Sequence, residues 1–243
     1  MAKKKRSGFR RFLRIVFRFI LILFLSSTLY MLLCKWVEPP ITITQLGAVF
    51  GGYGLHRDYV SWNNISRNVK LAAIASEDQL FPEHHGFDWK SIEKSLNAPT
   101  TKKRKKRLAG GGASTISQQT AKNVFLWQGE GWGRYFRKGL EFYFTPQIEF
   151  VWGKRRILEV YLNVIEMGPG IFGIEAASQK YFHKHAKDLS KAEAAQIIAC
   201  LPNPKKFSVV PMSARVRSRY LWIMAQMDNL EGDEDVEDVI STP

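Results

Sequence analysis

The chain has 243 residues, with 36 Lys and Arg against 22 Asp and Glu, and 45% of its side chains are hydrophobic. This apolar fraction is enough for one globular domain and excludes both wholesale disorder and a small disulfide-stabilised protein. Eight basic residues precede position 19 with no acid among them, and seven acids follow position 227 with no base. Residues 19–227 keep 28 basic against 15 acidic side chains. The body of the protein should therefore attract anions such as phosphates, nucleic acid or acidic lipid.

The N-terminal segment predicts a membrane anchor. No charged residue occurs from Phe19 to Cys34, and the run FILILFLSSTLYMLLC is long enough, with the residues before it, to cross a bilayer as one helix. The sequence places the transmembrane helix at residues 19–35, after a basic segment at 1–18. The positive-inside rule leaves that basic segment in the cytoplasm and everything after Lys35 outside it. A cleavable signal peptide is the alternative, but no small-x-small cleavage site follows the apolar run.

This topology changes which anionic partner the basic body is expected to meet. A basic domain held at the outer side of a bilayer encounters anionic lipid headgroups rather than nucleic acid. We therefore expect membrane lipid among the partners and no nucleic acid.

The rest of the chain divides into a body at residues 36–227 and an acidic tail at 228–243, which its composition predicts to be disordered. Residues 41–53 look extended and then rich in turns. From there the patterns are mainly helical: Ser66 can cap one helix, and Ser190 with Glu193 forms a capping box that opens another. The sequence predicts a mostly α domain.

Several short motifs match known functional patterns, but their context does not support the corresponding function. The glycines at 168, 170 and 173 match G-x-G-x-x-G, but they follow an amphipathic helix rather than a strand, so we do not predict a dinucleotide site. The histidine pairs at 84–85 and 183/185 have no cysteine cluster beside them, and no metal ligands are predicted. Cys34 and Cys200 lie in apolar patterns and are expected to be reduced packing residues.

An acidic pair, Glu77 and Asp78, ends an apolar helix and runs into a loop. A carboxylate there faces the negative end of the helix dipole, and apolar neighbours remove water from it, so both effects disfavour its charged form. Such a group suits proton abstraction. The alternative is an ordinary solvated helix end.

A glycine-rich turn at 110–112 precedes hydroxyls and amides that open a helix containing Lys122, directly after a basic run at 102–107. Backbone and side-chain donors of this kind can hold an anion. A solvated loop followed by a helix cap is the other interpretation. Further along, Arg137 and Glu141 are four residues apart and share one helix face, which taken alone predicts a surface ion pair.

Together these segments resemble the bacterial peptidoglycan glycosyltransferases, glycosyltransferase family 51. The resemblance follows the chain in order: E-D-x-x-F-x-x-H-x-G-x-D at 77–88, G-x-S-T-I-S-Q-Q-x-x-K-N at 112–123, R-K-x-x-E at 137–141, K-x-x-I-L-E-x-Y-L-N at 154–163, and a fifth piece at 168–182. The sequence is most similar to the monofunctional members, which lack a transpeptidase domain. Ala113 in the glycine turn, Gly139 and the basic run at 102–107 depart from the family pattern.

The resemblance implies a lysozyme-like glycosyltransferase domain with a small membrane-proximal lobe. It implies an enzyme that polymerises lipid II into β-1,4-linked glycan strands by an inverting displacement, releasing polyprenyl diphosphate in cell wall biosynthesis. The chain would then be a single-pass protein of the bacterial inner membrane, with its N-terminus cytoplasmic and its catalytic domain periplasmic. Its partners would be lipid II, the growing strand and other cell-wall synthesis proteins.

The resemblance also implies roles for individual residues. Glu77 would be the general base, and Glu141 a second catalytic carboxylate that orients the donor or nearby cations. The substrate and its diphosphate would be bound by Ser114, Thr115, Gln118, Gln119, Lys122, Arg137 and Lys154. No cofactor is required, although a divalent cation such as Mg²⁺ can bridge a diphosphate near Glu77.

Two other functions stay open from the residues alone. A lytic transglycosylase that cleaves existing strands would also use a carboxylate in a lysozyme-like fold. A non-catalytic, membrane-anchored scaffold for wall synthesis would need neither the carboxylates nor the cations.

Overall fold

The computed structural model describes residues 3–90, 92–93, 114–129 and 133–241, and it divides into two compact units, Met1–Glu38 and Pro39–Pro243. The boundary between them lies three residues after the predicted one, directly before the Pro39-Pro40 pair. The basic run at 102–107 and the glycine turn at 110–112 lie outside the described residues.

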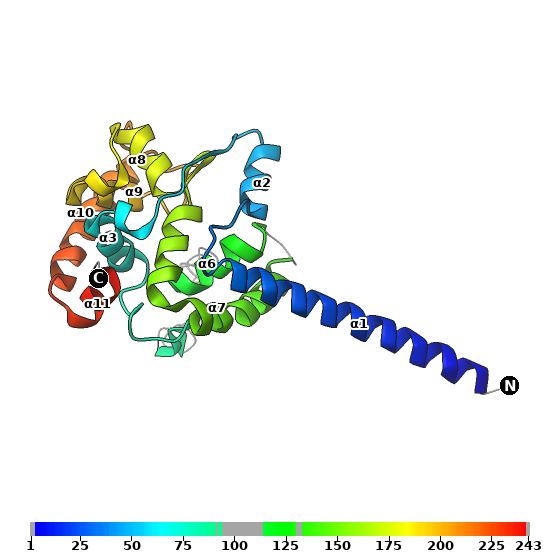
Figure 1. The fold of residues 1–243 in the computed structure, drawn as a ribbon. Helices are drawn as coiled ribbons and strands as arrows, with labels where there is room; N and C mark the ends of the chain where they lie inside the picture. The colour runs from blue at the N-terminus through cyan, green and yellow to red at the C-terminus, as the bar shows by residue number, and fades with distance from the viewer. Residues whose placement is uncertain (1–2, 91, 94–113, 130–132, 242–243) are drawn as a thin grey trace. The chain divides into compact units, whose positions relative to one another are not determined.

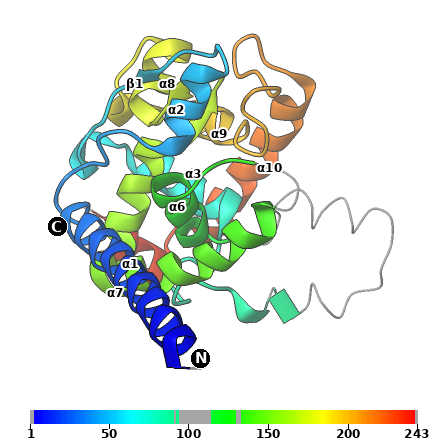
Figure 2. The same cartoon turned by 90° about the vertical axis from the view of Figure 1, so that its right-hand side faces the viewer.

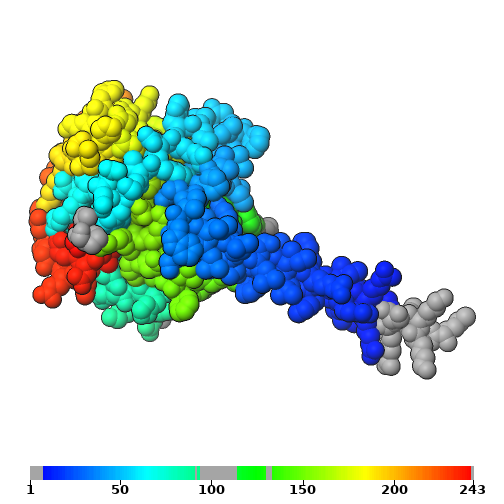
Figure 3. All heavy atoms as spheres, in the orientation of Figure 1, coloured from blue at the N-terminus to red at the C-terminus, as the bar shows by residue number. Residues whose placement is uncertain are grey.

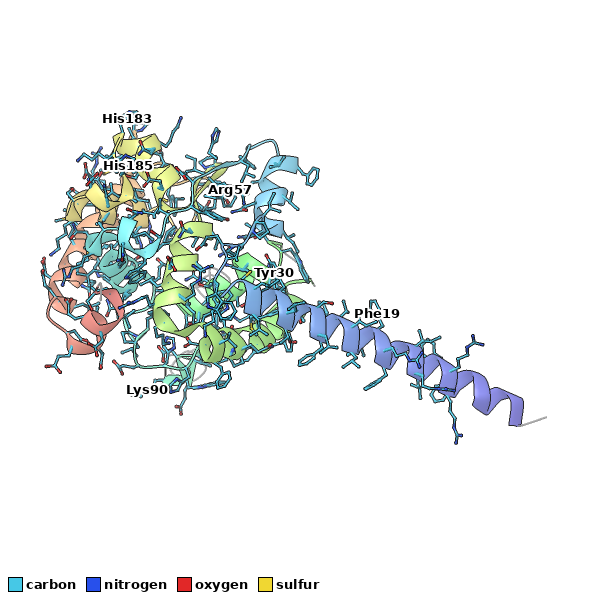
Figure 4. All side chains as sticks on the ribbon, in the orientation of Figure 1. Phe19, Tyr30, Arg57, Lys90, His183 and His185 are labelled. Atoms are coloured by element: carbon cyan, nitrogen blue, oxygen red, sulfur yellow. The ribbon has the colours of Figure 1, made fainter. Side chains whose placement is uncertain are left out.

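The first unit consists mainly of one long helix, α1 (Lys3–Leu33). Its segment Gly8–Leu33 has a mean hydropathy of 2.2 and is the one described helix long and apolar enough to cross a membrane. At 1.5 Å per residue its 26 residues extend about 39 Å, which exceeds the roughly 30 Å hydrocarbon core. Large apolar side chains are exposed along α1, among them Phe17 and Phe19, of which Figure 4 labels Phe19. The predicted apolar helix is confirmed, and it begins earlier than residue 19.

The second unit is mostly helical (Figure 1), as the sequence predicts. Its helices and short 3₁₀ turns are α2 (Ile43–Phe50), η1 (Trp62–Asn64), α3 (Arg67–Glu77), α6 (Ile116–Phe125), α7 (Gly133–Val164), α8 (Ile174–Phe182), η2 (Ala186–Asp188), α9 (Lys191–Ile198), α10 (Ala214–Leu230) and α11 (Glu234–Ile240). Three short strands, β1 (His56–Arg57), β2 (Glu166–Gly168) and β3 (Ile171–Phe172), form one small sheet in the order β1-β3-β2.

Helix α3 is the central helix of the core. Every residue from Val69 to Ala75 is buried, so the helix is covered on all sides, and its alanines allow α9 and α10 to approach closely (Figure 2). The predicted caps are confirmed: the Ser66 side chain accepts from Val69 N, and Ser190 with Glu193 forms the capping box of α9. The C-terminal end of α3, where Glu77 lies, is thereby held by the core.

Helices α6 and α7 form the other large packing contact. The aromatic rings of Phe125 and Phe144 stack across it with centroids 4.6 Å apart. Helix α7 has a break at Gly153, whose φ of 72° and ψ of 167° belong to a region that is nearly restricted to glycine. The break lets residues 133–152 pack on α6 while residues 154–164 enter the buried core.

The expectation of an extended segment at 41–53 was wrong. The structure has α2 there, and its N-cap is Thr42, which forms a capping box with Gln45. The T-x-x-Q pattern is a known helix-start signal, and it outweighs the β-branched residues on either side.

The G-x-G-x-x-G match has a packing explanation. Gly170 and Gly173 have φ values of +69° and +85°, and a Cβ on Gly170 would lie 2.1 Å from the carbonyl oxygen of Tyr53. The backbone of Gly170 instead accepts a hydrogen bond from His56 N at 2.8 Å, which joins β1 to the β2–β3 hairpin. These glycines let two backbone segments approach each other.

The prediction of a disordered tail at 228–243 was wrong for most of its length. Helix α10 continues to Leu230, and α11 packs on α3 with Val236 and Ile240 almost fully buried. Figure 3 shows the red atoms of α11 within the surface of the larger unit. Acidic composition predicts disorder, but two apolar side chains four residues apart on one helix face dock this segment, and Glu237 of the same helix also pairs with Arg67 of α3.

Candidate active site

Glu77 is the last residue of α3, and both of its carboxylate oxygens have partners. Oε1 accepts a hydrogen bond from Ser76 Oγ at 2.9 Å, and Oε2 accepts one from Gln119 Nε2 at 3.3 Å. Arg219 Nη2 lies 3.6 Å from Oε1. The carboxylate is therefore held between the end of α3, the first turns of α6 and a side chain of α10.

Asp78, the next residue, is buried and connects three segments. Its carboxylate accepts from Ile116 N at 2.9 Å and lies 3.0 Å from His84 Nε2. Since the amide of Ile116 belongs to the first turn of α6, this contact fixes the start of α6 against the end of α3. Asp78 is committed to the scaffold, whereas Glu77 points toward α6 side chains.

Thr115 and Gln118 lie within the scaffold. Thr115 is the N-cap of α6 and forms a capping box with Gln118, and its hydroxyl also donates to the Gly86 carbonyl at 2.7 Å. Both side chains are nearly fully buried. The Thr115 hydroxyl and the Gln118 side-chain oxygen are used to start α6 and to hold the 81–86 loop, whereas the Gln118 amide nitrogen has no hydrogen-bond partner among the described residues. Their predicted role as substrate ligands stays a prediction.

Gln119, the next residue of α6, contacts Glu77, the candidate general base. Its amide nitrogen donates to Glu77 and to the Ser114 carbonyl, each at 3.3 Å, and its oxygen accepts from the hydroxyl of buried Tyr161 at 3.4 Å. Gln119 therefore orients the Glu77 carboxylate from the α6 side.

A second charged group lies on α7. Glu141 is almost fully buried, and it accepts from Lys138 Nζ at 2.8 Å and faces Arg137 Nε at 3.5 Å. Arg137 also donates to the carbonyls of Trp127 and Gly129, at 3.1 and 3.0 Å. Lys138 reaches Ser114 Oγ at 3.4 Å. The expected surface pair Arg137–Glu141 is thus part of a partly buried cluster that includes Ser114.

Lys122 interacts both with Glu77 and with the Arg137–Lys138–Glu141 group. The residue as a whole is half-buried, and its ammonium lies close enough to interact electrostatically with four charged side chains, those of Glu141, Arg137, Lys138 and Glu77. Burial lowers the pKa of Lys122, and the nearby Glu141 partly offsets this. Among the residues that the structure describes, no hydrogen-bond acceptor or ion-pair partner lies within contact distance of its Nζ. The ammonium is therefore available to an anionic ligand.

Lys154 is held elsewhere. Its Nζ donates to Glu149 at 2.8 Å and to the His84 carbonyl, and it lies 4.6 Å from the centroid of the Phe81 ring. Burial lowers its pKa, and the Glu149 carboxylate partly offsets this. The geometry makes Lys154 a support for the 81–86 loop and does not bring it to Lys122 and Arg137.

Three contributors to this arrangement were missed by sequence reasoning. Lys138 lies within the R-K-x-x-E motif, and its i,i+3 spacing to Glu141 was the available signal. Tyr161 was visible only as an apolar helix position. Arg219 lies 142 positions from Glu77, so no local pattern relates the two.

The histidines are placed away from this cluster or within its scaffold. His84 contacts Asp78, while His183 and His185 lie at the C-terminal end of α8 and beyond it (Figure 4). His185 is bonded to Glu175 at 2.8 Å. In the described part of the chain no three His, Cys, Asp or Glu side chains are grouped to hold a metal ion. The two cysteines are thiols.

The comparison with known families agrees with this arrangement. The family model described as Transglycosylase matches residues 44–228, which include every residue of the cluster. The chain belongs to the transglycosylase family. A biosynthetic peptidoglycan transglycosylase of Shigella boydii serotype 4 (strain Sb227) is 54% identical over 181 residues, covering 74% of this chain and 72% of that protein. One of Escherichia coli (strain K12 / DH10B) has the same identity and coverage. The family resemblance drawn from the ordered motifs is confirmed.

Proposed function

We propose that this transglycosylase is a monofunctional peptidoglycan glycosyltransferase that polymerises lipid II into β-1,4-linked glycan strands in cell wall synthesis. One observation carries the proposal. The half-buried Lys122 interacts electrostatically with Glu77 and with the Arg137–Lys138–Glu141 group, so one site offers a proton acceptor and cations for a departing anion. The names of the relatives, both biosynthetic, favour synthesis over a lytic enzyme or a non-catalytic scaffold.

The reaction is one inverting displacement. The 4-hydroxyl of the acceptor sugar attacks the anomeric carbon of the donor, a strand carried on polyprenyl diphosphate, and the new C–O bond forms as the bond to the diphosphate oxygen breaks. Glu77 takes the hydroxyl proton, which later passes to solvent, and the diphosphate leaves with the bonding electrons.

Diphosphate is a good leaving group, and its departure needs charge stabilisation more than protonation. Lys122 supplies a cation without an internal partner among the described residues, and Arg137 and Lys138 lie beside it. Glu141 holds Arg137 and Lys138 in place. Ser114 and Gln119 offer polar atoms between the two groups, and Thr115 and Gln118 shape the start of α6. Lys154 keeps the 81–86 loop in position.

Helix α1 supports the proposed location. A helix of this hydropathy and length fits a membrane anchor. With the basic residues before position 19 on the cytoplasmic side, the second unit lies at the outer face of the inner membrane, where a polyprenyl-linked substrate is found.

The test is a polymerisation assay with the full-length chain, purified lipid II and detergent, with the products separated by size. The proposal predicts consumption of lipid II and growth of strands, and strands added beforehand should not shorten. Lys122→Gln and Arg137→Gln should impair polymerisation while the far-ultraviolet circular dichroism spectrum is unchanged. Shortening of added strands without consumption of lipid II would instead identify a lytic enzyme, and no reaction of either kind would favour a scaffold.

A further inference from the structure

The side chain of Arg219 reaches from α10 to the C-terminal end of α3. Its Nη2 lies 3.1 Å from Ser76 Oγ, 3.4 Å from the Ser76 carbonyl oxygen and 3.6 Å from Glu77 Oε1. Helices α3 and α10 pack side by side in both ribbon views (Figures 1 and 2). A cation from a distant part of the chain therefore lies against the carboxylate proposed as the base.

The contact has a direct and an indirect component. The Ser76 hydroxyl accepts from Arg219 and donates to Glu77 Oε1 at 2.9 Å. The other carboxylate oxygen, Oε2, accepts from Gln119. Arg219 and Ser76 thus fix one oxygen of Glu77, and α6 fixes the other, which leaves the carboxylate little freedom to rotate.

Arg219 is itself held in place. Its guanidinium carbon lies 5.3 Å from the centroid of the Trp222 ring, one turn further along α10, and only 22% of its side chain is exposed. A guanidinium stacked on an indole and shielded from water interacts more strongly with a nearby carboxylate than a solvated one does. The stacking on Trp222 is therefore suited to hold the Arg219 guanidinium in a fixed position beside Glu77.

We infer that Arg219 is a positioning residue for the glycosyl transfer, which orients the Glu77 carboxylate before the acceptor binds. This inference rests on the proposed function, because it assigns Glu77 the role of base. An ionised carboxylate is the form that can take a proton. A purely structural role is the alternative, since a cation at the end of α3 also stabilises the last carbonyls of that helix.

Other ionisable groups also lie near Glu77. They are Lys122 of α6, Tyr161 of α7, Cys200 after α9 and Arg219 of α10. Burial raises the pKa of both Tyr161 and Cys200, so these two side chains stay uncharged at neutral pH. Among the described residues around Glu77, the cations are Lys122 and Arg219.

The experiment measures kcat and KM for lipid II, in detergent, for the full-length wild type and four variants. Arg219→Gln removes the charge, Arg219→Lys retains it, and Glu77→Gln removes the base. Arg217→Gln is the matched control, because Arg217 is an exposed arginine of the same helix. Thermal unfolding of each variant reports the structural effect separately.

The inference predicts that Arg219→Gln lowers kcat by roughly 10- to 100-fold with little change in KM. Such a split is expected because the orientation of the base acts on the reacting complex and not on substrate binding. Arg219→Lys should recover part of the lost kcat, and Arg217→Gln should match the wild type.

A folded Arg219→Gln variant with the wild-type kcat would overturn the inference. If Arg219→Gln does not fold, Arg219→Lys decides: a reduced kcat with an unchanged KM supports the inference, and a wild-type kcat overturns it. Glu77→Gln keeps the two proposals distinct. Full activity in that variant would remove the base role itself, whereas an inactive Glu77→Gln beside a wild-type-like Arg219→Gln would remove only the positioning role.

Discussion

The side-chain amide of Gln119 donates a 3.3 Å hydrogen bond to Glu77 and accepts one from the buried hydroxyl of Tyr161. Three elements of the fold, α3, α6 and α7, therefore meet at one glutamine. Precise placement of a reacting group accounts for a large part of catalysis, because small displacements are costly. The first prediction concerns this residue.

Gln119→Ala should lower kcat by roughly 10- to 100-fold, because Glu77 loses the contact that orients its Oε2. The measurement is lipid II polymerisation under saturating substrate. Gln147→Ala is the control, since Gln147 bonds only to the Tyr143 carbonyl within its own helix among the contacts of the described residues. Equal activities of the two variants would contradict the role given to Gln119.

The lowered pKa of Lys122 leads to a prediction for kcat/KM at alkaline pH. Burial lowers its pKa, so its ammonium loses its proton at a lower pH than an ordinary lysine does, and the attraction for diphosphate falls as pH rises through that value. At pH values well below the pKa of Lys122, the side chain carries its full positive charge. The alkaline limb of kcat/KM should move to higher pH in Lys122→Arg, because a guanidinium stays protonated. An alkaline limb at the same pH in both proteins would assign it to another group.

Two glycines of α7 make a matched pair for stability. A Cβ at either Gly139 or Gly153 would meet no atom within 4 Å, but Gly139 is helical and Gly153 has a φ of 72°. Gly139→Ala should stabilise the protein by about 0.5–1 kcal/mol, since alanine is the better helix former. Gly153→Ala should destabilise it by about 1–3 kcal/mol, since alanine is strained at that φ. Chemical denaturation of both variants measures the two effects. A change in the free energy of unfolding with the same sign in both variants would contradict the break in α7.

The docking of α11 gives a further stability prediction. Ile240 is 1% exposed, and its truncation to alanine should cost about 2 kcal/mol or more by leaving a cavity. Asp238→Ala is the control, because Asp238 is exposed on the same helix. Unfolding free energies that are the same for both variants would mean that the segment does not contribute to the fold.

The sequence could predict those parts of the site that lie within short ordered motifs. Glu77, Lys122, Arg137 and Glu141 each belong to such a motif, and the structure brings them into one electrostatic cluster. Local patterns also predicted the caps at Ser66 and Ser190, because a helix start depends on residues only three positions apart.

The remaining features depend on tertiary contacts that no local pattern contains. Arg219 reaches Glu77 only because α10 packs on α3. Thr115 and Gln118 were assigned to substrate as part of a motif, although their T-x-x-Q spacing is also that of a capping box, which the structure shows. Helix α11 was missed because composition averages over the two buried side chains that dock it.

The most direct test of the account is the rate of lipid II polymerisation by Glu77→Gln, with lipid II binding measured in parallel. Glutamine retains the shape of the side chain and cannot take a proton at neutral pH. The account predicts that binding is retained and that the rate falls on the order of 10²–10⁴-fold, as loss of a general base does. Polymerisation at the wild-type rate would contradict it.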